Sequence, residues 1–228
     1  MNNEFALSLK NVSYSHDKGM ALNDVSIDFI KGKNTVILGP NGAGKSILLK
    51  ICHELLEPGS GSLSFPNGYN QTSMVFPKPV FLRRTVLENL IYVLEISGVQ
   101  KEQRNEKAKT ALKQFSMTEL ADHPARSLSS GEKQRLSVIR ALLLEPDILF
   151  LDEPTANLDP SATAILENMI EETNITTIMA SHDLMQAKRI AEQIIYIENG
   201  DIIECNDAKS FFEKPETPQA QKFIEGRL

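Results

Sequence analysis

The sequence predicts an α/β fold with a mostly parallel sheet, an antiparallel β part near the N-terminus and an inserted helical part. Three observations lead to this prediction. From residue 146 onward, short aliphatic runs alternate with amphipathic helical runs, which is typical of parallel strands covered by helices. Residues 5–30 instead alternate apolar and polar positions, as half-buried antiparallel strands do. Residues 77–145 show helical periodicity only.

Hydrophobic periodicity and turn residues give the expected elements. Strands are expected at 5–14, 22–30, 35–38, 62–65, 73–76, 148–151, 176–180, 193–198 and 201–205. Helices are expected at 47–51, 86–94, 108–115, 130–145, 160–173, 183–191 and 207–213, followed by a polar tail. Turns are expected near Asp17-Lys18-Gly19, Asn67-Gly68 and Asn199-Gly200. We expect one domain, 1–228, in which 77–145 is a helical subdomain and 1–76 with 146–228 form the core and antiparallel parts.

A glycine-rich stretch between an aliphatic run and a helical run matches the phosphate-loop pattern G-x-x-x-x-G-K-[ST]. Its glycines allow backbone N–H groups to approach phosphate oxygens, and the helix that follows adds partial positive charge. The lysine is expected to reach the outer phosphates and the serine hydroxyl to ligate Mg²⁺. We therefore predict a P-loop NTPase core that binds ATP and Mg²⁺. The expected nucleotide contacts are Gly39, Pro40, Asn41, Gly42, Ala43, Gly44, Lys45, Ser46 and Ile47.

Composition narrows the class of protein. The 228 residues carry 24 basic and 30 acidic side chains, a net charge of −6, which argues against broad binding to nucleic acid. The two cysteines, Cys52 and Cys205, lack metal-like spacing and are expected to be free thiols in a reducing compartment. No signal peptide or spanning helix is apparent, so we expect a cytoplasmic protein that reaches the membrane only through a partner.

Two acidic residues close an apolar strand. Asp152 suits Mg²⁺, and Glu153 is placed to polarise an attacking water as a general base. Ser181-His182-Asp183 ends another expected strand. Because ligands of parallel sheets bind beyond the carboxyl ends of the strands, both clusters and the phosphate loop are expected to meet at one edge.

The stretch LSSGEKQR, residues 128–135, resembles the signature of ATP-binding cassette (ABC) ATPases, and the resemblance covers nearly the whole chain. In that family the signature faces the γ-phosphate of ATP bound to the other subunit of a head-to-tail dimer. The resemblance therefore implies trans contacts from Ser129 and Gly131, which also lie at an expected helix N-terminus. Ser130 stands where the family usually has glycine. An N-cap role for Ser129 or Ser130 is compatible with this interpretation.

Three further residues match family positions. Tyr14 matches the aromatic residue that stacks on adenine, although a strand tyrosine also serves in packing. Asp159 matches the loop that crosses the dimer interface and, before Pro160, also makes a good helix start. His182 matches the histidine that hydrogen-bonds the γ-phosphate, which makes it a catalytic candidate together with Lys45 and Glu153.

Pro77 departs from the family pattern. The family normally has glutamine here, helping to hold Mg²⁺ and the attacking water, whereas proline has no polar side chain and no backbone N–H. One alternative to an active ATPase is therefore a module that dimerises on ATP and hydrolyses it weakly.

The leading hypothesis is the ATPase subunit of a membrane transporter. The resemblance implies a homodimer or paired cassette beneath integral membrane permease subunits, and a bacterial or archaeal importer with a solute-binding protein. Residues 78–85 resemble cassettes of tungstate and phosphate importers. An ABC protein of DNA repair or translation would carry a coiled-coil insert or paired cassettes, and a small-molecule kinase would not explain residues 128–135.

Overall fold

A computed structural model describes residues 5–16, 19–66 and 71–226 of the chain. The strands are β1 (Phe5–His16), β2 (Gly19–Ile30), β3 (Asn34–Leu38), β4 (Ser60–Ser64), β5 (Thr72–Val75), β6 (Ile148–Asp152), β7 (Thr176–Ser181), β8 (Gln193–Glu198) and β9 (Asp201–Asp207). The helices are α1 (Lys45–Cys52), α2 (Val86–Ile96), α3 (Lys101–Gln114), α4 (Ser130–Leu142), α5 (Pro160–Glu171), α6 (Leu184–Ile190), α7 (Ala208–Glu213) and α8 (Pro218–Ile224). Two 3₁₀ turns, Thr118–Leu120 and Ala125–Ser127, precede α4. The expected turns at Asp17-Lys18 and Asn67-Gly68 lie outside the described residues.

The strands form two sheets, as the sequence predicts. A three-stranded antiparallel sheet has the order β2-β1-β4, and a six-stranded sheet has the order β5-β6-β7-β3-β8-β9. All neighbours in the larger sheet pair in parallel except β8 and β9, which form the expected hairpin. β4 and β5 are neighbours in the chain but belong to different sheets.

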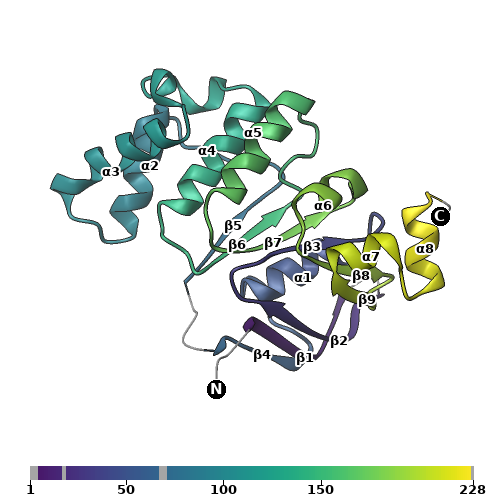
Figure 1. Ribbon diagram of the computed structural model, residues 1–228. Helices are drawn as coiled ribbons and strands as arrows, with labels where there is room; N and C mark the ends of the chain where they lie inside the picture. The colour runs from purple at the N-terminus through teal and green to yellow at the C-terminus, as the bar shows by residue number, and fades with distance from the viewer. Residues whose placement is uncertain (1–4, 17–18, 67–70, 227–228) are drawn as a thin grey trace.

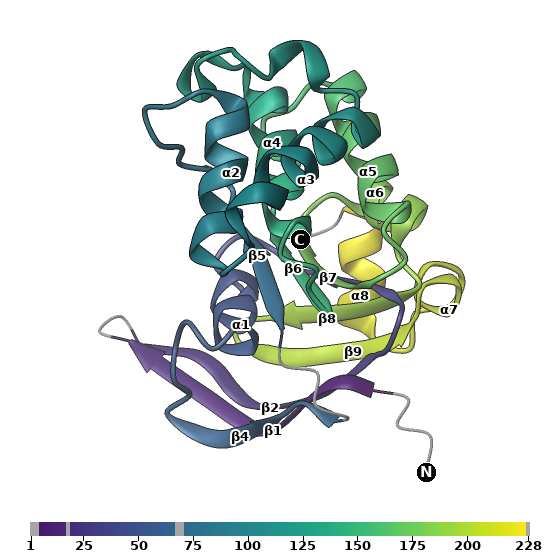
Figure 2. The ribbon, with the colours of Figure 1, turned by 90° about the vertical axis from the view of Figure 1, so that its left-hand side faces the viewer.

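Alternation along the central strands gives the larger sheet two apolar faces. In β6, Ile148 and Phe150 join the cluster that contains α1 and the antiparallel sheet, whereas Leu149 and Leu151 join the cluster that contains the other helices. Figures 1 and 2 show α1 between the two sheets and α2 to α6 over the opposite face of the larger sheet. Both faces are buried, which explains why β6 is a continuous apolar run.

Side-chain caps fix the starts of most helices. Thr85 and Ser129 begin α2 and α4 with reciprocal capping boxes, and Asp159 begins α5 with Pro160 at its first turn. Each cap accepts a hydrogen bond from a backbone N–H that would otherwise lack a partner. Helix α4 ends at Leu142, three residues before the expected end at 145.

The C-terminal segment differs from the expected polar tail. Helix α8 forms there because Thr217 caps it and Pro218 occupies its first turn. Its Phe223 stacks on Tyr196 of β8 with ring centroids 4.8 Å apart, so the helix packs over β8, next to the edge strand β9.

The predicted division at residues 77 and 145 stays a prediction, because a single apolar cluster joins α2, α3 and α4 to the sheet. Within the described residues, no helix combines the length and apolarity needed to span a bilayer.

Candidate nucleotide-binding site

Strand register brings the predicted site residues to one edge of the sheet. Leu38, the last residue of β3, pairs with Ser181 of β7, and Asp152, the last residue of β6, pairs with Ala180. Because these strands are parallel, the segments that follow them leave the sheet side by side. The predicted meeting of the three clusters is confirmed by this register.

The loop at 39–46 fits its position only with glycine at two places. A Cβ at Gly39 would overlap the backbone oxygen of Ile197, and one at Gly44 would lie 2.6 Å from the backbone oxygen of Ala21. Gly44 also has φ of 108°, a conformation that side chains disfavour. Ala43, 3% exposed, anchors the loop in the core beneath α1. The loop is therefore held closely against β8 and β2.

Lys45 points back into its own loop. Its Nζ donates hydrogen bonds to the backbone oxygens of Gly39 at 2.7 Å and Pro40 at 3.0 Å, and lies 3.8 Å from Oε1 of Glu153. Burial lowers the pKa of Lys45, and the carboxylates of Glu153 and Asp152 oppose this shift. Phosphate oxygens would supply the negative charge that favours the protonated amine.

Ser46 and Asp152 form a pair of oxygen donors. The Ser46 hydroxyl donates to Oδ1 of Asp152 over 2.7 Å, and Asp152 is only 3% exposed. Burial raises the pKa of Asp152, while the bond from Ser46 acts in the opposite direction. A desolvated carboxylate next to a hydroxyl is the hard, oxygen-rich donor set that Mg²⁺ prefers, so these two residues fit the ion.

Glu153 and His182 are in contact. Oε2 of Glu153 lies 3.2 Å from Nδ1 of His182, and the Glu153 side chain is 23% exposed. Glu153 adopts φ of 44°, so the chain turns sharply as it leaves β6. The turn directs the carboxylate toward both Lys45 and His182.

A cavity of about 430 Å³ opens beside these groups. It is lined by Asn41, Gly42 and Gly44 to Ile47, by Glu153, and by His16, Met20 and Ala21 of the antiparallel sheet. Tyr14 does not line it and instead packs against the apolar cluster under that sheet. His16, which lies two positions after Tyr14 at the end of the same strand, was not among the predicted nucleotide contacts.

A family model described as ABC transporter matches residues 22–156. The chain belongs to the ABC transporter family. The arginine transport ATP-binding protein ArtP of Haemophilus influenzae is 34% identical, over 96% of this chain and 99% of its own length. The phosphate import ATP-binding protein PstB 1 of Vibrio parahaemolyticus is 32% identical, over 97% of this chain and 90% of its own length. The solved structure of CbiO1 of Clostridium perfringens, part of the ABC transporter complex cbiONQ, has a TM-score of 0.83 and 27% sequence identity. The match covers 99% of this chain and 97% of CbiO1. The protein is thus an ABC transporter ATPase.

The remaining family motifs of this ABC cassette lie away from the cavity and hold helix ends. Ser129 caps α4 and exchanges hydrogen bonds with Glu132, and Asp159 accepts a hydrogen bond from the backbone of Ala162. A Cβ at Gly131 would lie 2.9 Å from Cβ of Ala162, so glycine permits the close approach of α4 to α5. The structure brings none of these residues to the cavity of the same chain.

Pro77 follows β5 and is exposed. Nearby, the buried side chain of Gln134 donates to the backbone oxygen of Phe76 over 3.2 Å. Its own Oε1 is buried without a hydrogen-bond partner. An amide from α4 of this ABC cassette therefore lies one residue from the position where the family usually carries glutamine.

Proposed function

We propose that this protein is the ATP-binding and ATP-hydrolysing subunit of an ABC importer, and that ATP-driven closure of two cassettes powers transport. The observation that carries the proposal is the convergence of Lys45, Asp152 and Glu153 beside the phosphate-loop cavity. Transition-state charge on the transferred phosphoryl group would meet the loop N–H groups, Lys45 and His182.

Ser46 and Asp152 are the residues proposed to hold Mg²⁺. Bound there with the nucleotide, the ion supplies neutralising charge for the phosphates. The existing 2.7 Å contact keeps both oxygens together in advance, so little rearrangement of the two side chains is needed.

Glu153 is the proposed general base. Its carboxylate is only partly exposed and reaches the cavity, so it is able to accept a proton from a water held against the γ-phosphate. His182, 3.2 Å away, would orient that carboxylate and hydrogen-bond the γ-phosphate.

The base of the nucleotide is proposed to contact the antiparallel sheet. His16 and Met20 line the cavity there, and an imidazole ring offers a flat face on which adenine stacks. This assigns to His16 the role that the family resemblance implied for Tyr14.

Two copies of the chain are proposed to complete each site. Ser129, Gly131 and Asp159 do not line the cavity of their own chain, which is compatible with contacts to ATP bound by a partner copy. The N-terminus of α4 is suited to such a contact because its first N–H groups favour a phosphate.

An apolar groove is the proposed docking surface for integral membrane permease subunits. A cavity of about 480 Å³ lies between β5 and helices α2 and α4, and Val80 and Ile96 at its margin are 76% and 66% exposed. Docking would hold the cassette on the inner face of the membrane.

The relatives are named for arginine transport and for phosphate import, so we propose a small polar solute delivered by a solute-binding protein, with an oxyanion such as phosphate or tungstate as the first to test.

An assay of the purified protein tests the ATPase. We expect Mg-ATP hydrolysis in the wild-type protein and none in Lys45→Ala, because the lysine stabilises charge on the phosphates. Absence of hydrolysis from the wild-type protein, with ATP binding intact, would favour the alternative of a nucleotide-gated module with weak hydrolysis.

Pro77 is the observation behind that alternative. We predict a low basal rate that Pro77→Gln raises without a comparable gain in nucleotide affinity, because the amide would position the attacking water. Steady-state hydrolysis and nucleotide titration of both forms measure this. An unchanged rate would mean that another group, such as the amide of Gln134, fills the role.

A further inference from the structure

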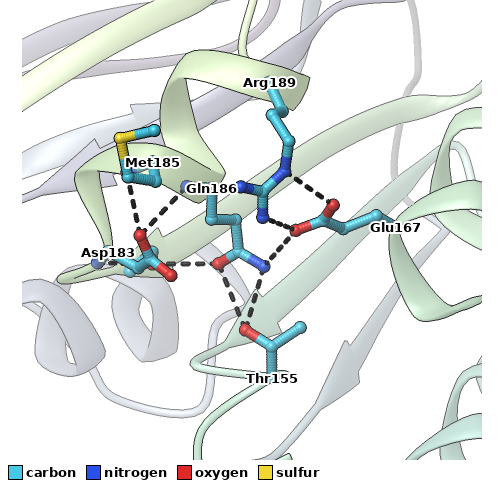
Figure 3. A network of polar contacts seen from close by, with 7 residues as sticks. Thr155, Glu167, Asp183, Met185, Gln186 and Arg189 are labelled. Atoms are coloured by element: carbon cyan, nitrogen blue, oxygen red, sulfur yellow. Dashed lines mark hydrogen bonds and ion pairs between the residues drawn. The ribbon is translucent and has the colours of Figure 1, made fainter. Parts of the chain in front are cut away.

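A buried polar network joins the segments that follow β6 and β7 (Figure 3). At its centre is Gln186 of α6, which is 1% exposed. Its Nε2 donates to Oγ1 of Thr155 over 2.9 Å and to Oε1 of Glu167 over 3.1 Å, and its Oε1 accepts from Oγ of Ser181 over 3.0 Å. Each partner comes from a different part of the chain.

The orientation of the Gln186 amide is fixed by its neighbours. Glu167 is 7% exposed, and Arg189 binds it through both Nε, at 3.1 Å, and Nη2, at 2.7 Å. A carboxylate accepts but does not donate, so it holds the NH₂ of the amide toward α5. The amide oxygen is then left to face Ser181. A neutral amide supplies both polarities at this point, whereas a carboxylate or an apolar side chain does not.

The network leads directly to the two groups of the candidate site. Thr155 lies two residues after Glu153, and Ser181 immediately precedes His182. The hydroxyl of Ser181 also accepts from the backbone N–H of Asp183, so the two chain neighbours of His182 are tied to each other. Asp183 in turn accepts from the backbone N–H of Gln186 over 3.0 Å. One side chain therefore ties the turn that carries Glu153 to the turn that carries His182.

We propose that Gln186 is a positioning residue for ATP hydrolysis, which sets the contact between Glu153 and His182 by holding Thr155 and Ser181 at one relative position. The proposal rests on the catalytic roles given to Glu153 and His182 above. Gln186 does not line the nucleotide cavity, so it acts on the rate of the chemical step and not on ATP binding. Displacement of a reacting group by about 1 Å lowers a rate by about a hundredfold.

The first experiment compares two buried glutamines. Gln186→Met keeps the length of the side chain but removes all three contacts, and we expect kcat for ATP hydrolysis to fall at least tenfold while KM changes less than about twofold. Gln193→Met is the matched control. Gln193 is 6% exposed and bonds Thr35 and the backbone of Asp28, at the opposite end of the sheet from the candidate site. We expect Gln193→Met to lower stability but to leave kcat near the wild-type value.

A second experiment tests the polarity of the network. Gln186→Glu places two carboxylates against each other and removes the donor to Glu167, so kcat should fall. Adding Glu167→Gln restores a donor toward the carboxylate at 186, which still accepts from Ser181, while Arg189 keeps a single acceptor at 167, the amide oxygen. We expect this double variant to recover part of the lost kcat, because the bond from Nη2 of Arg189 is not restored. If Gln186→Glu lowered kcat only by reducing the fraction of folded protein, kcat per folded molecule would not change between the single and the double variant.

The outcomes separate this proposal from the function on which it rests. Wild-type kcat in folded Gln186→Met, equal losses in Gln186→Met and Gln193→Met, or no recovery in the exchanged pair would each overturn the positioning role. If Gln186→Met does not fold, Thr155→Val combined with Ser181→Ala removes the same two ties, and an unchanged kcat would overturn it equally. Failure of the proposed function appears elsewhere, as hydrolysis that does not depend on Glu153 in a protein with Gln186 intact.

Discussion

Burial decides how individual charged side chains behave in this protein. Lys45 and Asp152 are nearly inaccessible to solvent. Desolvation lowers the pKa of Lys45 and raises the pKa of Asp152, and both shifts favour the neutral form of the group. Both groups nevertheless sit beside oppositely charged or hydrogen-bonding partners that limit the shift. A site prepared in this way favours a ligand that brings phosphate charge and a divalent cation together.

His53 gives a prediction for pH. Burial lowers the pKa of His53, and the negative charge of Glu54 only partly opposes this shift. Nδ1 of His53 contacts Oγ1 of Thr72 over 2.7 Å. A lowered pKa means that the unfolded chain binds a proton more readily, so the free energy of unfolding should fall as pH drops below about 6.5, the ordinary value for histidine. The fall continues until the pH reaches the lowered pKa of the folded state.

Denaturant titrations at several pH values measure this. His53→Gln removes the titrating group and keeps a polar atom near Thr72, so the variant should lose less stability than the wild-type protein between neutral pH and about pH 5. Equal losses in the two proteins would show that His53 does not contribute to the acid sensitivity.

Helix α4 illustrates how a motif residue serves packing at the scale of an element. Gly131 lies where α4 approaches Ala162 of α5, and an added methyl group would be 2.9 Å from the alanine Cβ. We predict that Gly131→Ala lowers the free energy of unfolding by about 1–3 kcal/mol, because overpacking forces the helices apart. Denaturant unfolding should show Ser130→Ala, at the exposed neighbouring position, close to wild type.

The companion variant Ala162→Gly removes the overlap. In the Gly131→Ala background it should restore part of the lost free energy of unfolding. The gain is reduced by about 1 kcal/mol, because glycine within a helix is less stable than alanine. A Gly131→Ala protein as stable as the wild type would contradict the packing role and leave only a role toward a ligand or partner.

Elements with strong patterns were predicted well from the sequence. The apolar stripe of α2 and the continuous apolar run of β6 identify both elements, and strand ends identify the edge where Glu153 and His182 meet. The lateral order of the strands was not predictable, because β3, β6 and β7 are all buried and similarly apolar. Helix α8 was missed because it presents few apolar residues, although Thr217-Pro218 carried a helix-start signal.

Site residues outside the motifs were the harder part of the prediction. The family resemblance places the stacking role at Tyr14, near the end of the first strand, whereas His16 of the same strand lines the cavity. Gln186 and Glu167 carry no motif, and their contact arises only when α5 and α6 lie side by side on the sheet. Such tertiary contacts leave no local signature in a single sequence.

At the scale of the whole molecule, the proposed mechanism requires two copies of the chain. The cavity is formed by one cassette, and the signature residues of that cassette hold helix ends elsewhere on its surface. We predict that Ser129→Arg binds ATP normally as a monomer but does not hydrolyse it, because its added cation and bulk would occupy the phosphate position of the partner's site.

Mixing this variant with Lys45→Ala tests the arrangement. In a mixed dimer one composite site carries both lesions and the other carries neither, so hydrolysis should return. Native mass spectrometry verifies that mixed dimers form. If they form and remain inactive in the presence of Mg-ATP, the proposed contribution of Ser129 to an independently acting site on the partner is contradicted.

The most direct test of the central claim is the rate of ATP hydrolysis by Glu153→Gln. Loss of a general base should lower the rate by about 10²–10⁴-fold while leaving Mg-ATP affinity near the wild-type value, because the amide keeps the shape of the side chain. Glu171→Gln, on the exposed end of α5, is the matched control and should hydrolyse ATP normally. A Glu153→Gln protein that hydrolyses ATP at the full rate would contradict the account.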